Sequence, residues 1–215
     1  MLHKKVTVEK RNEFACEAFN RRNEIPKKLK LSKRYIEKLL RHYFCESAVE
    51  KFYDSEPDFD DEERDIIKEL HRKLLKRSMN KNDSNEVGML VNLQDWTDII
   101  VNGTEDGIRL KEDKKAFDLI CTAPKNSLLF FHNHPKNSCF SERDLESFMT
   151  SDAIKMMSVV CNNGRLYYLI KMDTFDRCEA LMYYEAIYSK TESGSVKEFL
   201  RTCSKVGLKF IYGGE

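Results

Sequence analysis

The sequence predicts an α/β fold in which a mixed β-sheet is flanked by helices and preceded by an N-terminal helical extension. Before residue 80, apolar residues recur at three- to four-residue spacing, whereas short apolar runs alternate with amphipathic stretches after it. Between the two patterns lies a polar, turn-prone segment over residues 80–85, which is typical of a linker. We therefore expect a helical region over residues 1–80 and an α/β domain over residues 81–215.

Composition excludes several classes of protein. The 215 residues hold 37 Lys and Arg against 36 Asp and Glu, which argues against a uniformly basic nucleic-acid binder. No apolar run approaches the roughly 20 residues that span a bilayer, and the first residues lack the apolar core of a secretory signal. The seven cysteines are scattered without a CxxC pair. We expect a cytoplasmic protein with reduced thiols and no membrane association.

Charge is distributed unevenly along the chain. Residues 1–44 are rich in Lys and Arg, whereas residues 54–63 form an acidic run. The basic segment over residues 21–41 has three interpretations. It forms a solvated helical face, it docks on acidic parts of the same chain, or it binds a partner, either a protein or the phosphates of a nucleic acid.

The N-terminal region predicts two amphipathic helices. The second begins at Asp60 or Asp61, with acidic residues in its first turn and basic residues in its last, which matches the helix dipole. Each helix has one apolar stripe that we expect to be buried. These stripes comprise Tyr35, Leu39, Leu40, Tyr43 and Phe44 in the first helix, and Ile66, Ile67, Leu70, Leu74 and Leu75 in the second.

The remainder of the chain predicts strands and helices in alternation. Strands are expected over residues 87–93 and 98–101, then a helix over 113–121, then a strongly apolar strand over 127–132. Residues 156–161 and 165–171 form a hairpin, because the intervening Asn162, Asn163 and Gly164 tolerate positive φ. Amphipathic helices are expected over about 174–189 and 195–203.

A cluster of polar residues after the apolar strand indicates metal chemistry. His132 and His134 lie two apart in a strand, so both imidazoles project to one face, and Pro135 ends the strand. Ser141 is a good N-cap, which places Asp144 in the first turn of the next helix. Two imidazoles and a carboxylate suit Zn²⁺ and leave a fourth position for water. The alternative is a polar surface pair of histidines beside a simple capping box.

The pattern His-x-His-Pro followed by Ser-x-x-Asp resembles the signature of the JAMM family, also called MPN+ or JAB, of zinc metallopeptidases and isopeptidases. The family also carries an upstream glutamate, in a pattern like Glu-x-x-Gly-Leu-Leu. Here Glu86 precedes Gly88 with one residue fewer between them. The resemblance covers about residues 85–171. Asn133 between the histidines, and the five residues between Pro135 and Ser141, are similar to the bacterial and phage RadC-like branch.

The resemblance implies an MPN (JAB)-like sheet and a mechanism. His132, His134 and Asp144 would hold Zn²⁺, which lowers the pKa of bound water to about 7 and polarises the substrate carbonyl. Glu86 would act as general base, and the Ser141 hydroxyl would donate to the oxyanion. The implied activity is that of a JAMM-type zinc metalloprotease, which hydrolyses a peptide or isopeptide bond in a protein tail.

Alternatives remain for the function and for single residues. The runner-up function is a non-catalytic MPN-type scaffold or a nucleic-acid-associated, RadC-like binding protein. Presence of all five implied site residues favours the enzyme. Cys139 is either a loop cysteine or a fourth, inhibitory thiolate ligand. Residues expected at the surface or in packing roles are His3, His42 and His71, together with Asn133, which faces away from the histidines.

Overall fold

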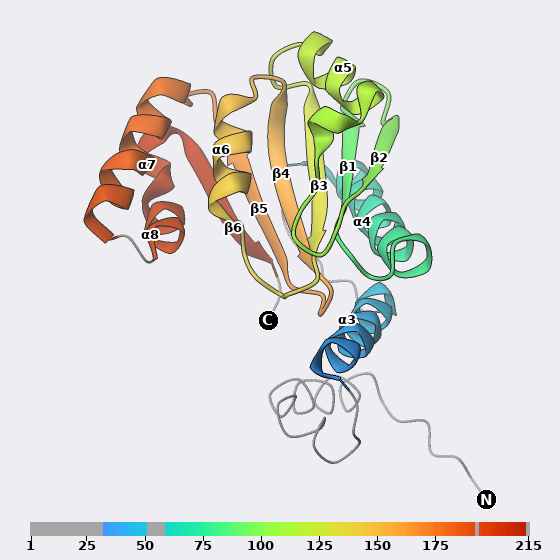
Figure 1. The fold of residues 1–215 in the computed structure, drawn as a ribbon. Coiled ribbons are helices and arrows are strands. Elements are labelled where there is room, and N and C mark those ends of the chain that lie inside the picture. The colour runs from blue at the N-terminus through green and yellow to red at the C-terminus, as the bar shows by residue number, and fades with distance from the viewer. Residues whose placement is uncertain (1–31, 51–58, 192–193, 214–215) are drawn as a thin grey trace, which may run out of the picture.

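The computed structural model describes residues 32–50, 59–191 and 194–213 (Figure 1). Its centre is a six-stranded sheet in the order β2-β1-β3-β4-β5-β6. Strands β3 and β4 are parallel, and every other neighbouring pair is antiparallel, so the predicted mixed sheet is confirmed. The strands are β1 (Val87–Asn92), β2 (Asp98–Asn102), β3 (Leu128–His134), β4 (Ile154–Cys161), β5 (Leu166–Lys171) and β6 (Leu208–Gly213).

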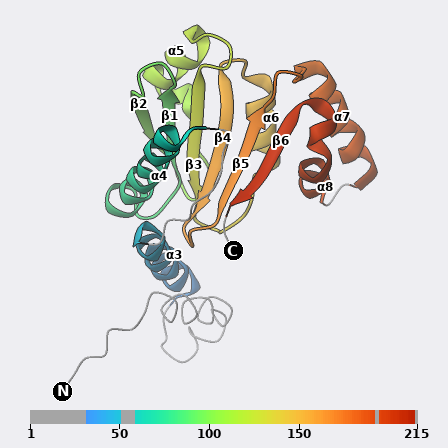
Figure 2. The ribbon, with the colours of Figure 1, turned by 180° about the vertical axis from the view of Figure 1, so that it is seen from behind.

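Helices cover both faces of the sheet, as predicted. Helix α4 lies on one face, and α6 lies on the other, with α7 and α8 beside the β6 edge (Figures 1 and 2). Each face has its own apolar cluster. In the described residues the helices are α3 (Lys33–Glu50), α4 (Asp61–Lys81), α5 (Lys114–Thr122), α6 (Glu142–Thr150), α7 (Arg177–Thr191) and α8 (Ser195–Thr202), with short 3₁₀ segments η1 (Leu110–Glu112) and η2 (Cys203–Val206).

Helix α4 packs directly on the sheet. Asp60 caps it through a capping box with Glu63, which confirms the predicted start. Its predicted stripe is buried at Ile67, Leu70, Leu74 and Leu75, in the same cluster as Met89, Phe131 and Tyr168 of the sheet. The apolar core is therefore continuous across the expected domain boundary between residues 80 and 81.

The segment over residues 80–85 is not a simple linker. Its first two residues belong to α4, and Ser84 is fully buried. The Ser78 hydroxyl donates to the carbonyl of Asn85 at 2.6 Å, and the Asn82 side-chain amide donates to the carbonyls of Glu86 and Gly103 at 2.8 and 3.0 Å. These polar side chains satisfy backbone groups that the helix end and strand start leave free, and they fix the backbone at Glu86.

Helix α3 differs from the expected buried stripe, and it shows where part of the basic segment docks. Tyr35 and Leu39, expected in its buried stripe, are 50% and 49% exposed. The residues that α3 buries instead include Cys45 and Ala48, whose small side chains allow a close approach to α4. The basic segment docks in part on the same chain, because Lys38 pairs with Asp83 and Arg41 with Glu105, both at 3.0 Å. Its residues 21–31, like His3, lie outside the described residues.

One strand lies outside the sequence predictions. β3 runs through His134 and ends before Pro135, as expected for a strand that carries both histidines beyond its apolar part. β6, an edge strand that pairs with β5, was not predicted at all. Its six residues follow a tight turn at Gly207, with φ of 69°, and carry no strong alternation of their own. Within the described residues, no helix has the length and apolar character needed to cross a bilayer.

Candidate metal centre

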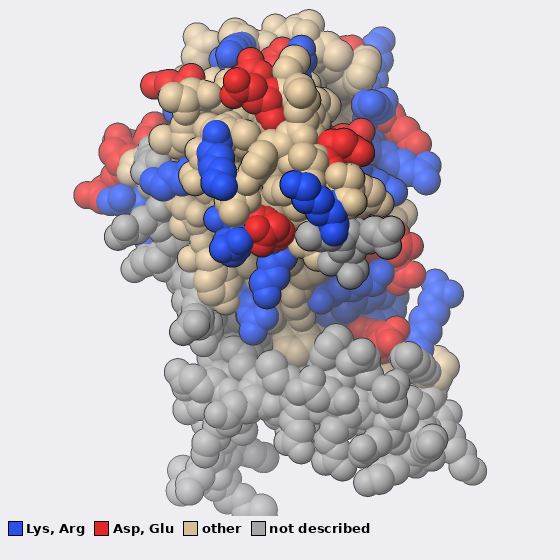
Figure 3. All heavy atoms as spheres, turned by 90° about the vertical axis from the view of Figure 1, so that its left-hand side faces the viewer, with Lys and Arg blue, Asp and Glu red and all other residues tan. Residues whose placement is uncertain are grey.

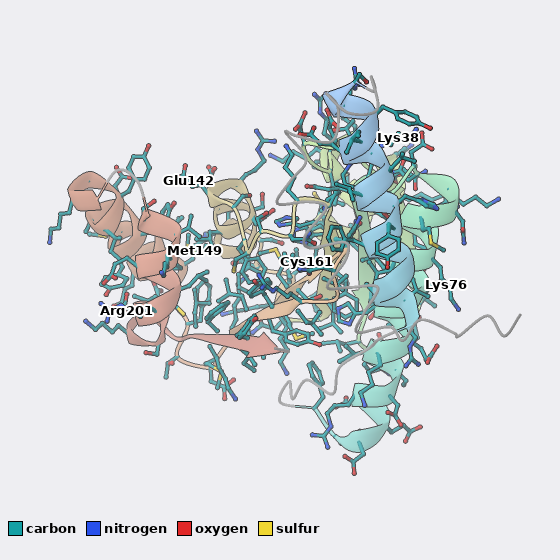
Figure 4. The ribbon with its side chains drawn as sticks, turned by 90° about the horizontal axis from the view of Figure 1, so that it is seen from below. Lys38, Lys76, Glu142, Met149, Cys161 and Arg201 are labelled. Carbon is teal, nitrogen blue, oxygen red and sulfur yellow. The ribbon has the colours of Figure 1, made fainter. Side chains whose placement is uncertain are left out.

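The two histidines of the motif lie at the end of β3, on the face that α6 covers. His132 is 1% and His134 is 6% exposed, and their Nε2 atoms are 3.1 Å apart. The His132 ring stacks on Phe130, with ring centroids 5.1 Å apart and planes within 11°. In the parallel ladder His134 of β3 pairs with Cys161 of β4. Figure 4 labels Cys161, which lies between α6 on one side and helices α3 and α4 on the other. The strand thus presents both imidazoles to one point, as its two-residue period predicts.

Asp144 completes the group from the first turn of α6. Its Oδ1 is 3.4 Å from Nε2 of His132, and its Oδ2 is 3.5 Å from Nε2 of His134. The backbone N–H and the hydroxyl of Ser141 both donate to Oδ2, at 2.6 and 2.7 Å. The capping box expected as the alternative is present, and the same bonds orient Asp144 toward the histidines.

The three side chains fit a zinc ion. Their ligand atoms lie within 4.8 Å of one another. The two Nε2 atoms are 3.1 Å apart, and each carboxylate oxygen of Asp144 lies 3.4 or 3.5 Å from one of them. In a tetrahedral zinc site with bonds of about 2.0–2.1 Å, neighbouring ligand atoms are about 3.3–3.4 Å apart. The three side chains therefore converge at roughly the spacing of zinc ligands, and binding through a single carboxylate oxygen would leave the fourth corner for water.

A further hydrogen bond prepares His134 as a ligand. Its Nδ1 is 2.9 Å from the carbonyl oxygen of Ser138, so Nδ1–H donates to that carbonyl. The lone pair of Nε2 is then free to face the other ligand atoms. Metal-binding imidazoles in proteins usually have such a partner, which fixes the tautomer and the ring orientation.

Electrostatics in the group favour an ionised carboxylate. Burial alone would raise the pKa of Asp144, but the attraction and hydrogen bonds of His132 and His134 hold it well below its usual range. Burial lowers the pKa of His132. For His134 burial acts in the same direction, yet Asp144 and Glu86 outweigh it and raise its pKa. A carboxylate between two imidazoles is ready to bind a cation.

Glu86 lies beside this group, immediately before β1. Burial raises its pKa to about 7, with opposing influences from His134, which lowers it, and Asp144, which raises it. Its backbone is fixed on both sides: its N–H donates to Thr104 at 3.0 Å, and its carbonyl accepts from Gly103 at 2.8 Å. A carboxyl group that titrates near neutrality is suited to accept and release a proton.

Other residues of the sequence analysis lie outside the metal group. Cys139 is not among the residues whose ligand atoms converge in the metal group, and burial raises the pKa of its thiol to about 11 in the metal-free protein. Asn133 faces the opposite side of β3, as expected, and accepts from the backbone N–H of Val87 at 2.7 Å. His71 is buried 2.7 Å from the Ser158 hydroxyl and has a packing role. His42 is exposed at the surface, where its ring lies 3.0 Å from the Ser84 hydroxyl.

Sequence reasoning missed the supporting residues of the site. The carbonyl of Ser138 and the amide of Asn82 have no recognisable motif, and their contacts depend on the folded loops. Asn133 could be noticed because it lies between the two histidines of the motif. Its side-chain amide donates to Oδ1 of Asn162 at 2.8 Å, but the sequence indicated only a turn at Asn162.

No protein-family model, curated protein or solved structure matches this chain. What can be said of its class therefore follows from the fold and the site: it is a mixed α/β protein with a candidate His₂Asp metal centre at the carboxyl end of a central strand.

Proposed function

We propose that this protein is a zinc-dependent hydrolase of the JAMM type, which cleaves a peptide or isopeptide bond in a protein tail. The observation that carries the proposal is the convergence of His132, His134 and Asp144, whose ligand atoms lie close enough together to hold one metal ion. The sequence motif supplies the reaction class and the MPN (JAB)-like assignment of the sheet. The described cysteines are all free, which supports a reducing, cytoplasmic setting.

The catalytic steps assigned to the chain depend mainly on Glu86. When bound, Zn²⁺ supplies a Lewis acid that lowers the pKa of a coordinated water and polarises the scissile carbonyl. Glu86 accepts the proton of the attacking water and delivers it to the leaving amine. In the metal-free protein its pKa is raised to about 7, so this carboxyl group is able to take up and release a proton near neutrality.

Ser141 has a structural contact and a proposed catalytic one. Its hydroxyl donates to Asp144 and accepts from the backbone N–H of Asp144 at 3.2 Å, so it positions the ligand. In the proposed reaction this hydroxyl turns its hydrogen toward the developing oxyanion of the substrate. A rotation about one side-chain bond is sufficient for that change.

The charges of the described residues give the binding-protein alternative less support. A half-buried carboxyl group of raised pKa beside three converging ligand side chains is typical of a catalytic site and is not required in a scaffold. Lys38 and Arg41 of the basic segment are engaged with acidic residues of the same chain. On the face of α7 and α8, basic and acidic side chains are interspersed (Figure 3). We therefore place the enzyme first.

The experiment that tests the proposal compares wild type with Glu86→Gln. Both proteins are loaded with zinc and incubated with a panel of fluorogenic linear peptides and lysine-linked isopeptides. We expect wild type to cleave at least one class, and Glu86→Gln to retain zinc while losing hydrolysis by at least about a hundredfold. A Glu86→Gln protein as active as wild type would move the base elsewhere, and an inactive wild type would contradict the enzyme assignment.

A further inference from the structure

A second site lies at the other end of the sheet from the candidate metal centre. It is a pocket of about 190 Å³, lined by residues that flank the starts of β3 and β4, the end of β5 and the start of α7. β3 and β4 run side by side in the same direction (Figure 1). Because pocket residues precede both strands and His134 ends β3, the pocket and the metal group lie at opposite ends of the strands. The pocket plays no part in the proposed hydrolysis.

The wall of the pocket contains a buried lysine. Lys171, the last residue of β5, is 3% exposed. Its Nζ lies 4.7 Å from the ring centroid of Phe148 and 5.0 Å from that of Phe175. Its ammonium group donates a hydrogen bond to the carbonyl of Ser151. Fully buried lysines are rare without a charged partner, and no described carboxylate forms an ion pair with this ammonium.

Two further cations line the pocket, so that with Lys171 it holds three cations against the two carboxylates Asp152 and Asp176. Lys125 and Arg177 are exposed at its rim. The carboxylate of Asp152 is paired with Arg177 at 3.4 Å. Asp176 accepts from the backbone N–H of Glu179 at 2.9 Å, where it caps α7. The start of this 15-residue helix adds a partial positive charge, so the local field favours an anion.

Hydrogen-bonding capacity is left unused next to the pocket. Asn126 lines it, and the Oδ1 of Asn126 is buried without a partner among the described residues. The hydroxyl of Ser151, whose carbonyl accepts from Lys171, is likewise buried and unpartnered there. Buried polar atoms without partners are uncommon in proteins, and they often mark a place where a ligand or water completes the bonding.

We propose that this pocket binds a small organic anion through one phosphate or carboxylate group, which Lys125, Lys171 and Arg177 neutralise together. A cavity of about 150 Å³ accepts a molecule the size of benzene, so the volume here suits an oxyanion on a body of a few carbon atoms. Burial lowers the pKa of Lys171 to about 8, and an adjacent anion would favour its charged form.

The test uses inorganic phosphate and acetate as separate probes of the intact chain. Each is titrated at pH 7 and at constant ionic strength, with chloride as the reference anion, and followed by calorimetry and by amide NMR shifts. The pocket variant is Lys125→Gln/Arg177→Gln. Its control is Lys114→Gln/Lys115→Gln, which removes the same charge from exposed positions on α5.

We expect saturable binding of at least one probe, with shifts centred on the amides of Asn126, Lys171 and Phe175. Binding weakens at least about tenfold in the pocket variant and is unchanged in the control. Preference for phosphate identifies a phosphorylated ligand, and preference for acetate identifies a carboxylate. The proposal is overturned if neither probe binds up to about 10 mM, well above the millimolar range of weak sites. The proposal is also overturned if the pocket variant and the control variant bind the probe with equal affinity.

Discussion

Gly88 of β1 lies directly opposite His132 of β3 in the antiparallel ladder. A Cβ atom at Gly88 would come within 3.0 Å of the Phe130 ring, on which His132 stacks, and within 3.2 Å of Ile108. The glycine that follows Glu86 in the sequence motif therefore has a physical reason in this fold. It leaves room for the ring that supports the first metal ligand.

Replacing this glycine should disturb the metal centre and the core together. We expect Gly88→Val to lower the free energy of unfolding by about 1–3 kcal/mol, because overpacking forces Phe130 to move. Zinc affinity should fall as well, since the His132 ring loses its support. Urea denaturation and zinc titration measure the two effects. If Gly88→Val has the stability and zinc affinity of wild type, the space beside the Phe130 ring does not require a glycine at this position.

Glu86 should titrate near neutrality in the metal-free protein. Burial is the main cause of its pKa of about 7, and an exposed glutamate titrates near 4.3. Glu86 should therefore lose its proton at a pH about two to three units higher than an exposed glutamate does. A bound dication should lower this pKa, because it favours the carboxylate. Carboxyl ¹³C NMR with and without zinc measures both values, and a midpoint near 4.3 without metal would contradict the desolvated site.

Ser141→Ala should reveal how much of the hydroxyl's role is structural. Loss of the N-cap should cost about 1 kcal/mol of stability, since the Asp144 backbone N–H loses its acceptor. The proposed oxyanion contact adds a fall in kcat of at least about a hundredfold with zinc still bound. Ser141→Thr keeps the hydroxyl and serves as the matched control. Full activity in Ser141→Ala would exclude the catalytic role.

His71 should make the fold sensitive to acid. Burial lowers its pKa to about 3, against about 6.5 in the unfolded chain, so the unfolded state binds a proton that the folded state refuses. Stability from this residue is present above about pH 6.5 and is lost progressively down to about pH 3. Between pH 7 and pH 5 the expected loss is about 2 kcal/mol. Urea denaturation of wild type and His71→Gln checks it, and equal pH dependence in both would refute the assignment.

Local patterns were sufficient to predict much of the site. A two-residue period places His132 and His134 on one face of a strand, and an N-cap at Ser141 places Asp144 in the first turn of α6. Each inference concerns residues close together in the chain. The geometry that joins them, with separations of 3.1 to 3.5 Å, follows from how the loop between β3 and α6 folds.

Features that depend on distant contacts could not be predicted in this way. The exposure of Tyr35 and Leu39 is decided by how α3 meets α4, since an amphipathic pattern does not identify the partner surface. The packed turn around Ser84 has a loop-like sequence because its polar side chains bond backbone groups inside the protein. β6 acquires its strand conformation from pairing with β5.

The most direct test of the account is the zinc content of the purified protein after dialysis against metal-free buffer. Elemental analysis should find about one zinc per chain in wild type and in His42→Ala, whose imidazole lies outside the metal group. His132→Ala/His134→Ala should remain folded by circular dichroism and hold almost none, because two of the three ligands are gone. Full zinc retention in that double variant, or a wild type that binds no zinc when supplied with it, would contradict the central claim.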